Sequence, residues 1–464
     1  MNPLPNHFRR AKLNLVLAIT FNLGLALTAL PAAAATATTA TTPPNVLLVI
    51  IDDIGPEQLG SYSGDQIANA APATTPNLDA LANSGVRFKN AWGFPVCSPS
   101  RAAMYTGRYP LRTQVGAVID DSSDNVLATS ETTLADVLTG AGINSSLVGK
   151  WHLGDSSANG GIDSPRVAGG FEHHSGLLSG ALPNYTSWTR YLDGVKKQKL
   201  ITTYATTYQS DDVLNYTAGS NPWFVTLALS APHSPFHKPT AGLYTRNLSA
   251  ISDCNSNNSS KRECYKAAIE AIDSELGRLL TTLNSQGKLA NTMVIVVGDN
   301  GTPSAVVDSS VDSSKAKGTV YQRGVRVPMI ISGPAVVSGG RVRDDLVSVT
   351  DVFATVAELT GQSQTTGQDS VSMVPYLANT IGSNATLRSS VYAETFTGSD
   401  PHNGSAALRD ARYKLIESMG SYIGFYDLLT DPEESQNLID SVLDSTAQAS
   451  LNSLKAEFDR LHNH

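Results

Sequence analysis

Basic residues, cysteines and aromatic residues are all scarce in this chain of 464 residues. Lysine and arginine number 33 against 41 acidic residues, so the chain has a net charge of −8 and is a poor candidate for a general nucleic-acid binder. Internal repeats, long low-complexity linkers and the composition bias of disordered or fibrous proteins are also missing. The 41% of hydrophobic residues is ample for a large α/β domain plus a smaller one.

The N-terminus has the composition of a targeting segment. Three basic residues precede an apolar run at 13–30, and small residues with A-x-A sites follow near 32–35. We predict a signal peptide over 1–34, a linker over 35–44 and a mature protein that is periplasmic or secreted, with no stable membrane insertion. The apolar run is also long enough for an uncleaved anchor, which is the alternative.

Three cysteines in an oxidising compartment allow one disulfide and leave one thiol over. Cys254 and Cys264 lie ten residues apart in a polar segment and could close a local bridge, or both could be free thiols. So short a loop would stabilise the fold by at most about 3 kcal/mol. Cys97 is then left without a disulfide partner, and an unpaired thiol in an exported protein indicates a role other than bridging.

Continuous apolar runs alternate with helical patterns through most of the chain. Such runs are typical of strands buried on both faces of a parallel sheet. Strands are predicted at 45–51, 145–148, 222–229, 292–297 and 327–332, and helices at 75–84, 131–138, 262–283 and 350–360. We therefore predict an α/β catalytic domain over 45–380, with a large mostly parallel sheet sandwiched by helices.

The predicted secondary-structure pattern changes after about residue 380. Short β-like stretches joined by turns lead to a helical pattern at 444–461. We predict a C-terminal subdomain over 381–464, with a small antiparallel sheet and its own helix.

Four of the predicted strands are followed by residues with ionisable or amide side chains that could catalyse a reaction or bind a ligand. Because parallel strands bring their carboxyl ends to one edge, where such sheets bind ligands, these residues are expected to converge. They are Asp52 and Asp53, Lys150 and His152, His233, and Asp299 and Asn300.

The converging residues suit a metal ion and an anion. Three carboxylates and an amide are hard oxygen donors, which favour Ca²⁺ or Mg²⁺ over Zn²⁺. Cationic donors for a tetrahedral anion are available from Arg101, Lys150 and Lys317. His152 and His233 could work as acid or base.

Cys97-Ser98-Pro99-Ser100-Arg101 stands at a predicted turn-to-helix junction. A helix N-terminus favours an anionic ligand and lowers the pKa of a thiol, so a reactive thiolate and a buried structural cysteine are both open interpretations of these five residues.

This pentapeptide, followed by AAMYTGRYP, resembles the Cys-x-Pro-x-Arg signature of the formylglycine-dependent sulfatases, a branch of the alkaline-phosphatase-like superfamily. The resemblance covers about Asn45 to Leu438. Its supporting segments occur in order: DDIG (52–55), TTPNLDALANSGVRF (74–88), GKWHLG (149–154), APHSPF (231–236), GDNG (298–301), KGTVYQRGVRVP (317–328), ARYKLIE (411–417) and FYDLLTDPEESQNL (425–438).

The resemblance implies an alkaline-phosphatase-like fold and a sulfuric ester hydrolase. Cys97 would be oxidised by a maturation enzyme to formylglycine (3-oxoalanine), whose hydrate attacks sulfur. The other roles follow by position. One ion, Ca²⁺ or possibly Mg²⁺, would be held by Asp52, Asp53, Cys97, Asp299 and Asn300; His233 would protonate the leaving oxygen, His152 would deprotonate the second hydroxyl, Arg101 would orient the hydrate, and Lys150 and Lys317 would bind sulfate with His233.

Two other functions remain open at this point. The same scaffold could hydrolyse a phosphonate or phosphate ester, or the chain could be a non-catalytic binder of sulfated glycans. A positioned pair of histidines argues against a pure binder. The substrate would be a sulfated small molecule or a sulfated glycan.

Several residues outside the motif are expected at the surface. His173, His174, His237 and His402 lie in loop-like sequence. Arg323 lies in Tyr321-Gln322-Arg323-Gly324, where the family has a Tyr-Glu-Gly-Gly run, and we expect a structural surface arginine, the alternative being an arginine that reaches a second anionic group. Loops at 173–174, 184–190 and 237–238 are expected to line the mouth of the site.

Overall fold

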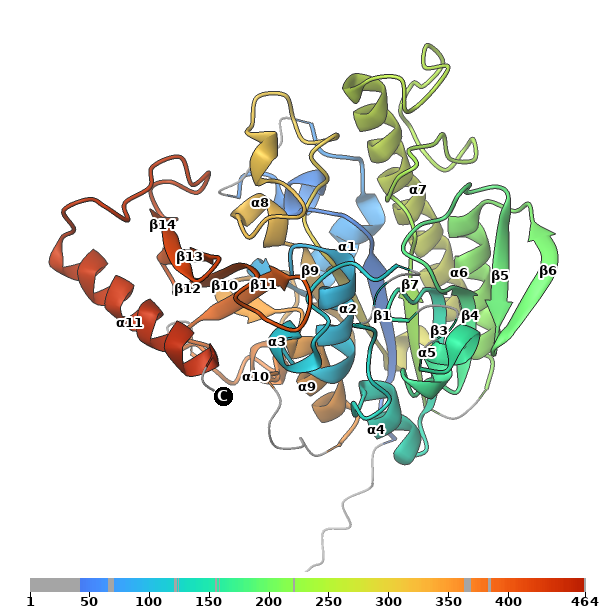
Figure 1. Cartoon of the computed structure of the whole chain (residues 1–464). Coiled ribbons are helices and arrows are strands. Elements are labelled where there is room, and N and C mark those ends of the chain that lie inside the picture. Colours follow the sequence, from blue (N-terminus) through green and yellow to red (C-terminus); the bar gives the residue numbers. More distant parts are fainter. Residues whose placement is uncertain are drawn as a thin grey trace, which may run out of the picture. The chain divides into compact units, whose positions relative to one another are not determined.

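Strand β1 (Asn45–Ile51) lies in the middle of a ten-stranded sheet (Figure 1). Its neighbours β7 (Trp223–Ala228) and β8 (Thr292–Gly298) run parallel to it, and β3 (Asn144–Lys150) runs parallel to β7. The full order is β10-β2-β9-β8-β1-β7-β3-β4-β5-β6, with β2 (Val86–Trp92), β4 (His173–Leu177), β5 (Trp188–Leu192), β6 (Val195–Ile201), β9 (Met329–Ser332) and β10 (Arg341–Ser348).

The computed structural model describes residues 42–462, apart from short internal segments at 66–70, 121–122, 124, 155–156, 158, 220–221, 363–368 and 383–384. The predicted signal peptide and most of the predicted linker lie outside the described residues. No helix within the described residues is long and apolar enough to cross a membrane.

Helices cover both faces of the large sheet. Alternate residues of β1 point to opposite faces of the sheet. Leu48 belongs to the hydrophobic cluster on one face, which includes residues of a first set of helices, and Leu47 belongs to the cluster on the other face, which includes residues of a second set. The first set is α2 (Cys97–Thr106), α4 (Leu134–Gly140) and α9 (Asp351–Leu359), and the second is α1 (Pro76–Ser84), α6 (Ala205–Tyr216) and α7 (Asn258–Ser285) (Figure 1). Among the described strands of this large sheet, only the pairings of β9 and β5 are antiparallel, so the predicted mostly parallel sandwich is confirmed.

Two helix starts differ from the prediction. Helix α1 begins at Pro76 and Thr75 in front of it makes no side-chain cap; instead Asp273, on α7, accepts hydrogen bonds from the backbone nitrogens of Asn77 (3.2 Å) and Leu78 (2.8 Å). Helix α4 begins three residues later than expected because Thr133 and Asp136 form a reciprocal capping box in front of it. Short helices α3 (Pro110–Thr113), α5 (Ser164–Val167), α8 (Gln322–Val325) and α10 (Val374–Leu377) connect the larger elements.

The C-terminal region forms the predicted antiparallel sheet. Its order is β11-β12-β13-β14, with β11 (Val391–Phe396), β12 (Gly404–Arg409), β13 (Tyr413–Ser418) and β14 (Ser421–Asp427), and α11 (Ser445–His462) packs on β12 and β13. Side chains of this sheet share one hydrophobic cluster with α2 and α9. Lys414 and Glu434 form a fully buried ion pair here, with 2.6 Å between Nζ and Oε1.

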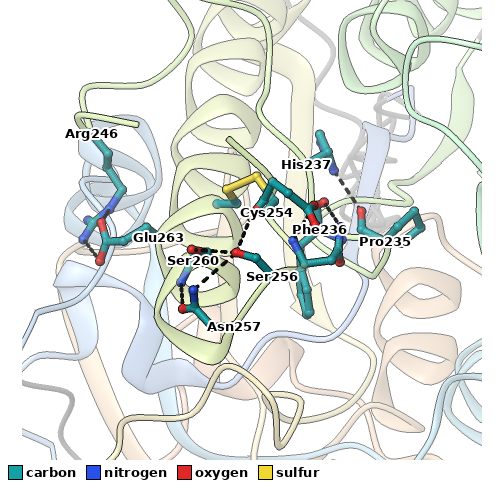
Figure 2. The surroundings of a disulfide bond; sticks show 12 residues. Pro235, Phe236, His237, Arg246, Cys254, Ser256, Asn257, Ser260 and Glu263 are labelled. Atoms are coloured by element: carbon teal, nitrogen blue, oxygen red, sulfur yellow. Dashed lines mark hydrogen bonds and ion pairs between the residues drawn. A yellow bond between two sulfur atoms is a disulfide. The ribbon is translucent and has the colours of Figure 1, made fainter. Parts of the chain in front are cut away.

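Cys254 and Cys264 are joined by a disulfide at the start of α7 (Figure 2). The segment between β7 and α7 packs against this bridge. Asn255, next to Cys254, donates from Nδ2 to the backbone oxygen of Phe236 (2.9 Å) and accepts from its backbone nitrogen (3.2 Å). The bridged segment therefore holds a loop that begins only a few residues after His233.

Candidate active site

Four neighbouring parallel strands, β8, β1, β7 and β3, end at one edge of the large sheet. The chain continues from each into a loop that carries ionisable or amide side chains. Each of these loops starts within a few residues of its strand, so the strand fixes where its polar side chains lie. The structure thus places together the residues predicted to converge: Asp52, Asp53, Lys150, His152, His233, Asp299 and Asn300.

The side chains of Asp52, Asp53 and Asp299 are buried, and hydrogen bonds join Asp299, Asp53 and Asn300. Asp299 Oδ1 accepts from the backbone nitrogens of Asp53 (3.0 Å) and Asn300 (2.9 Å), and Asn300 Nδ2 donates to Asp53 Oδ1 (2.8 Å). Asp53 has a φ of 69°, a left-handed conformation that is strained for a residue other than glycine. Such strain is typical of a residue held in place for a functional purpose.

Cys97 is the first residue of α2 and faces this acidic cluster. Its Sγ lies 3.4 Å from Asp52 Oδ1, 3.8 Å from Asp53 Oδ1 and 3.5 Å from Lys317 Nζ. Burial and the nearby Asp52 carboxylate raise the pKa of the Cys97 thiol well above its usual range. The raised pKa argues against a reactive thiolate at the helix N-terminus, one of the two interpretations of the sequence.

Three cationic side chains surround the cluster. Lys150 Nζ lies 2.5 Å from Asp52 Oδ2, and Lys317 Nζ contacts Asp53 Oδ1. Arg101 is fully buried, and its Nε and Nη2 bind Asp299 Oδ2 at 3.1 and 2.9 Å. Three positive charges are thus gathered beside the buried carboxylates, where they could bind an anionic group.

The electrostatics of the carboxylates follow from these contacts. Burial acts to raise the pKa of Asp52, but Lys150, His233 and Arg101 together lower it below its ordinary value. Burial and the charge of Asp52 raise the pKa of Asp299.

His152 follows β3 with a φ of 61°, again a left-handed conformation. Its Nε2 lies 3.0 Å from the backbone oxygen of Ile119, and its buried Nδ1 has no partner among the described residues. Burial and the positive charges of Lys150 and Arg101 lower its pKa well below 6.5, so the ring is a neutral base at neutral pH. Gly180 packs over the ring, and a Cβ there would lie 2.5 Å from His152 Nε2.

His233 lies on the other side of the cluster. Its Nδ1 is 2.7 Å from the backbone oxygen of Ser234, which fixes Nδ1 as a donor and leaves Nε2 facing Asp53 Oδ2 at 3.7 Å. Tyr185 supports this loop, because its hydroxyl lies 2.6 and 2.7 Å from the backbone oxygens of Ser230 and His233. With Nδ1–H committed to Ser234, the Nε2 position carries a lone pair in the neutral ring and a transferable proton in the imidazolium.

The cluster fits a divalent cation with oxygen ligands. Asn300 Oδ1 is buried and has no hydrogen-bond partner among the described residues, an arrangement that a cation would satisfy. Ligand atoms of Asp52, Asp53, Cys97 and His233 all lie within 4.8 Å of one another. Carboxylate and amide oxygens are the donors that Ca²⁺ and Mg²⁺ prefer.

A cavity of about 560 Å³ opens above Cys97. Its floor is formed by Cys97, His152, His233 and Lys317, and its walls by Val118, Ile119, Asp120, Gly154, Leu178, Ser179, Gly180, Ala181 and Tyr191. Of the loops expected at the mouth, 173–174 and 237–238 contribute no described lining residue, and 184–190 only borders Tyr191. The walls come instead from 118–120 and 178–181, which carry no motif.

Of the residues expected at the surface, two are buried and one is half-buried. His174 lies on β4 and is 1% exposed, and burial lowers its pKa to about 4. His237 is half-buried and stacks on Tyr185 with 3.7 Å between ring centroids. Arg323 is 5% exposed and pairs with Glu433 at 2.7 Å, a partner 110 residues away in the sequence. His173 and His402 are exposed as expected.

Residues that position the site were not predicted. Tyr265 donates from its hydroxyl to the backbone oxygen of Asp53 (2.7 Å), and Tyr185, Ile119 and Gly180 hold the two histidines. Each acts through a contact with a distant segment, so no local pattern of residue types marks it.

Comparison with known proteins agrees with this geometry. A family model described as Sulfatase matches residues 44–362, and one described as N-sulphoglucosamine sulphohydrolase, C-terminal, matches 315–464. Arylsulfatase A of Bos taurus is 30% identical over 94% of this chain and 92% of its own length, and N-acetylgalactosamine-6-sulfatase of Homo sapiens is 29% identical over 72% and 66%.

Solved structures match the fold. The crystal structure of Ps i-CgsB in complex with k-i-k-neocarrahexaose has a TM-score of 0.74 and 23% identity, over 91% of this chain and 93% of that one. The PsFucS1 sulfatase from Pseudoalteromonas sp. has a TM-score of 0.73 and 22% identity, over 90% of both chains.

Proposed function

Because this chain belongs to the sulfatase family, whose members hydrolyse sulfate esters, we propose that it does so through a formylglycine made from Cys97 and a bound divalent cation. One observation carries the proposal: Cys97 lies buried between paired carboxylates and Lys317, at the floor of the cavity. A thiol whose pKa is raised is a poor nucleophile there, whereas an oxygen nucleophile beside a cation is well served.

Residue 97 is proposed to be converted by a maturation enzyme to formylglycine, which supplies a hydroxyl nucleophile when hydrated. Asp52, Asp53, Asp299, Asn300 and residue 97 would hold the cation, Ca²⁺ or possibly Mg²⁺, which supplies Lewis-acid activation of that nucleophile. The buried, unpartnered Oδ1 of Asn300 supports this assignment.

The remaining residues handle charge and protons. Lys150 and Lys317, which contact Asp52 and Asp53, would neutralise the negative charge that develops on the sulfate oxygens. His233 would donate the Nε2 proton to the leaving oxygen, since its Nδ1 is committed to Ser234. His152, neutral because burial lowers its pKa, would accept a proton from residue 97, and Arg101 would fix the orientation of that residue through Asp299.

The cavity walls indicate the class of leaving group. Val118, Leu178 and Ala181 are apolar, Tyr191 is aromatic, and Asp120 is the charged residue of the described walls. Among the described residues that line the cavity, the walls contribute no lysine, arginine or histidine, and the basic side chains all lie on the floor. We therefore propose a sulfate monoester of a neutral phenol, alcohol or sugar as substrate, with a second sulfate group disfavoured by Asp120.

The compartment is proposed from separate features. The predicted signal peptide and the Cys254–Cys264 disulfide both favour an exported protein, periplasmic or secreted. Export is also the route on which the maturation of Cys97 would take place.

A mass measurement tests the mechanism. Trypsin releases residues 90–101 from protein co-produced with a formylglycine-generating enzyme, and this peptide should carry an aldehyde at position 97. Active protein with only cysteine in that peptide contradicts the mechanism. Rates on matched aryl sulfate and aryl phosphate esters, measured on the same sample, separate the sulfatase from the phosphate ester hydrolase, because only the former prefers the sulfate.

A further inference from the structure

A second group of potential metal ligands lies on the C-terminal sheet, where no motif points to it. His402 precedes β12, Glu417 lies on β13, and His462 is the last residue of α11. One ligand atom of each lies within 4.8 Å of the others. None of the three lines the catalytic cavity.

The spacing of the ligand atoms matches a tetrahedral ion. Glu417 Oε1 lies 3.2 Å from His402 Nδ1, and Glu417 Oε2 lies 3.8 Å from His462 Nδ1. Ligands about 2.0–2.2 Å from a tetrahedral Zn²⁺ are separated from each other by roughly 3.3 Å. The two imidazole rings meet edge to face, at 87° with 4.7 Å between centroids. A small closure of the three side chains would therefore bring them onto one ion.

The tautomer of His462 is set by residues behind it. Its Nε2 lies 3.2 Å from the Tyr392 hydroxyl, which in turn donates to Glu394 Oε2 at 3.0 Å. With the hydroxyl proton directed to Glu394, the hydroxyl oxygen accepts from Nε2–H, and the lone pair of Nδ1 faces Glu417. A metal-bound histidine characteristically donates its other ring N–H to such an oxygen.

The cluster is accessible to ions and has room for further ligands. Hollows of about 420 and 300 Å³ lie beside it, and both are lined by His402 and His462. Asp459, one turn before His462 on α11, lines the smaller hollow. His402 is half exposed, whereas Glu417 and His462 are 10% and 12% exposed in their side chains.

We propose that His402, Glu417 and His462 form a binding site for a divalent transition ion, with Zn²⁺ as the ion that two imidazoles and a carboxylate fit best. A bound ion fastens the end of α11 to β13 and to the turn before β12 (Figure 1). Metal bound only to the folded state raises the melting temperature.

The test titrates ZnCl₂ into the full-length protein, first stripped of transition metals and kept in excess Ca²⁺, by calorimetry and equilibrium dialysis. The wild type should bind one equivalent of Zn²⁺ and melt at a higher temperature with it. His402→Asn and His462→Asn should bind at least about tenfold more weakly and lose the shift in melting temperature. His173→Asn is the matched control, because His173 is an exposed histidine beside a single carboxylate, Asp193.

Asp299→Asn separates this site from the catalytic one and should keep the equivalent of Zn²⁺. Equal binding by the wild type and both histidine variants overturns the proposal, as does loss of the equivalent in Asp299→Asn alone. Absence of binding to the wild type at micromolar Zn²⁺ overturns it too. Should His462→Asn fail to fold, His402→Asn decides, since its half-exposed side chain contributes little to packing.

Discussion

The catalytic edge of the large sheet and the C-terminal sheet bury charge in opposite ways. At the catalytic edge, three carboxylates and three cations are crowded together, yet Asn300 Oδ1 and His152 Nδ1 keep no partner among the described residues. In the C-terminal sheet, Lys414 and Glu434 form a closed pair, and the second oxygen of Glu434 accepts from the backbone nitrogen of Gln322 at 2.6 Å. At the catalytic edge, the two unpartnered atoms are available to a ligand, whereas the satisfied ion pair of the C-terminal region supports the fold.

This contrast predicts that variants at the catalytic edge change activity more than stability. Cys97→Ala should lower the turnover of an aryl sulfate at least about 10³-fold, because the nucleophile is gone. Circular dichroism and the melting temperature should stay close to those of the wild type. Activity retained by this variant would contradict the assigned role of residue 97.

The next effect concerns His233 and depends on the leaving group. His233→Asn should slow hydrolysis about 10²-fold for an alkyl or sugar sulfate, because a poor leaving oxygen needs the proton. An aryl sulfate with a strongly acidic phenol should be affected much less. The ratio of kcat values for the two substrates is the measurement, and an equal loss on both would show that His233 is not the acid.

In the C-terminal sheet, the expected change is in stability. Lys414→Met leaves the Glu434 carboxylate buried without its cation and should lower the free energy of unfolding by about 3–5 kcal/mol. Adding Glu434→Gln should recover part of this loss, because the amide oxygen still accepts from Gln322. The control is Lys89→Met, whose exposed pair with Asp344 is worth no more than about 1 kcal/mol. Urea unfolding measures all three, and kcat of the folded fraction should not change.

The disulfide is expected to support both stability and the loop after His233. Its removal therefore tests whether effects on stability and on activity can be separated. Cys254→Ser with Cys264→Ser should cost about 3 kcal/mol for a loop of ten residues. Because Asn255 holds the loop that follows His233, a smaller loss of activity toward poor leaving groups should accompany it. Full activity at unchanged stability would show that the bridge supports neither.

The sequence was sufficient to predict the central strands and the catalytic cluster, for a physical reason. Strand β8, TMVIVVG, is buried throughout and therefore apolar throughout, so it can be recognised alone, and Asp299 and Asn300 follow it directly. Strand β10, RVRDDLVS, has an alternating and partly exposed first half at the sheet edge, so its residue pattern did not predict a buried strand. Arg323 was placed wrongly because Glu433, which buries it, is distant in the sequence. The cavity walls were missed for the same reason, since 178–181 acquire their role only when packed over His152.

The short span of the disulfide has a consequence for the chain before it folds. In the unfolded protein, three cysteines offer three pairings, and two of these would consume Cys97. The cost of closing a loop rises with its length, so the ten-residue closure is favoured about 60-fold over one spanning the 157 residues from Cys97 to Cys254. Chain statistics alone thus direct oxidation toward Cys254 and Cys264. They leave Cys97 as a thiol while the chain is still open to modification.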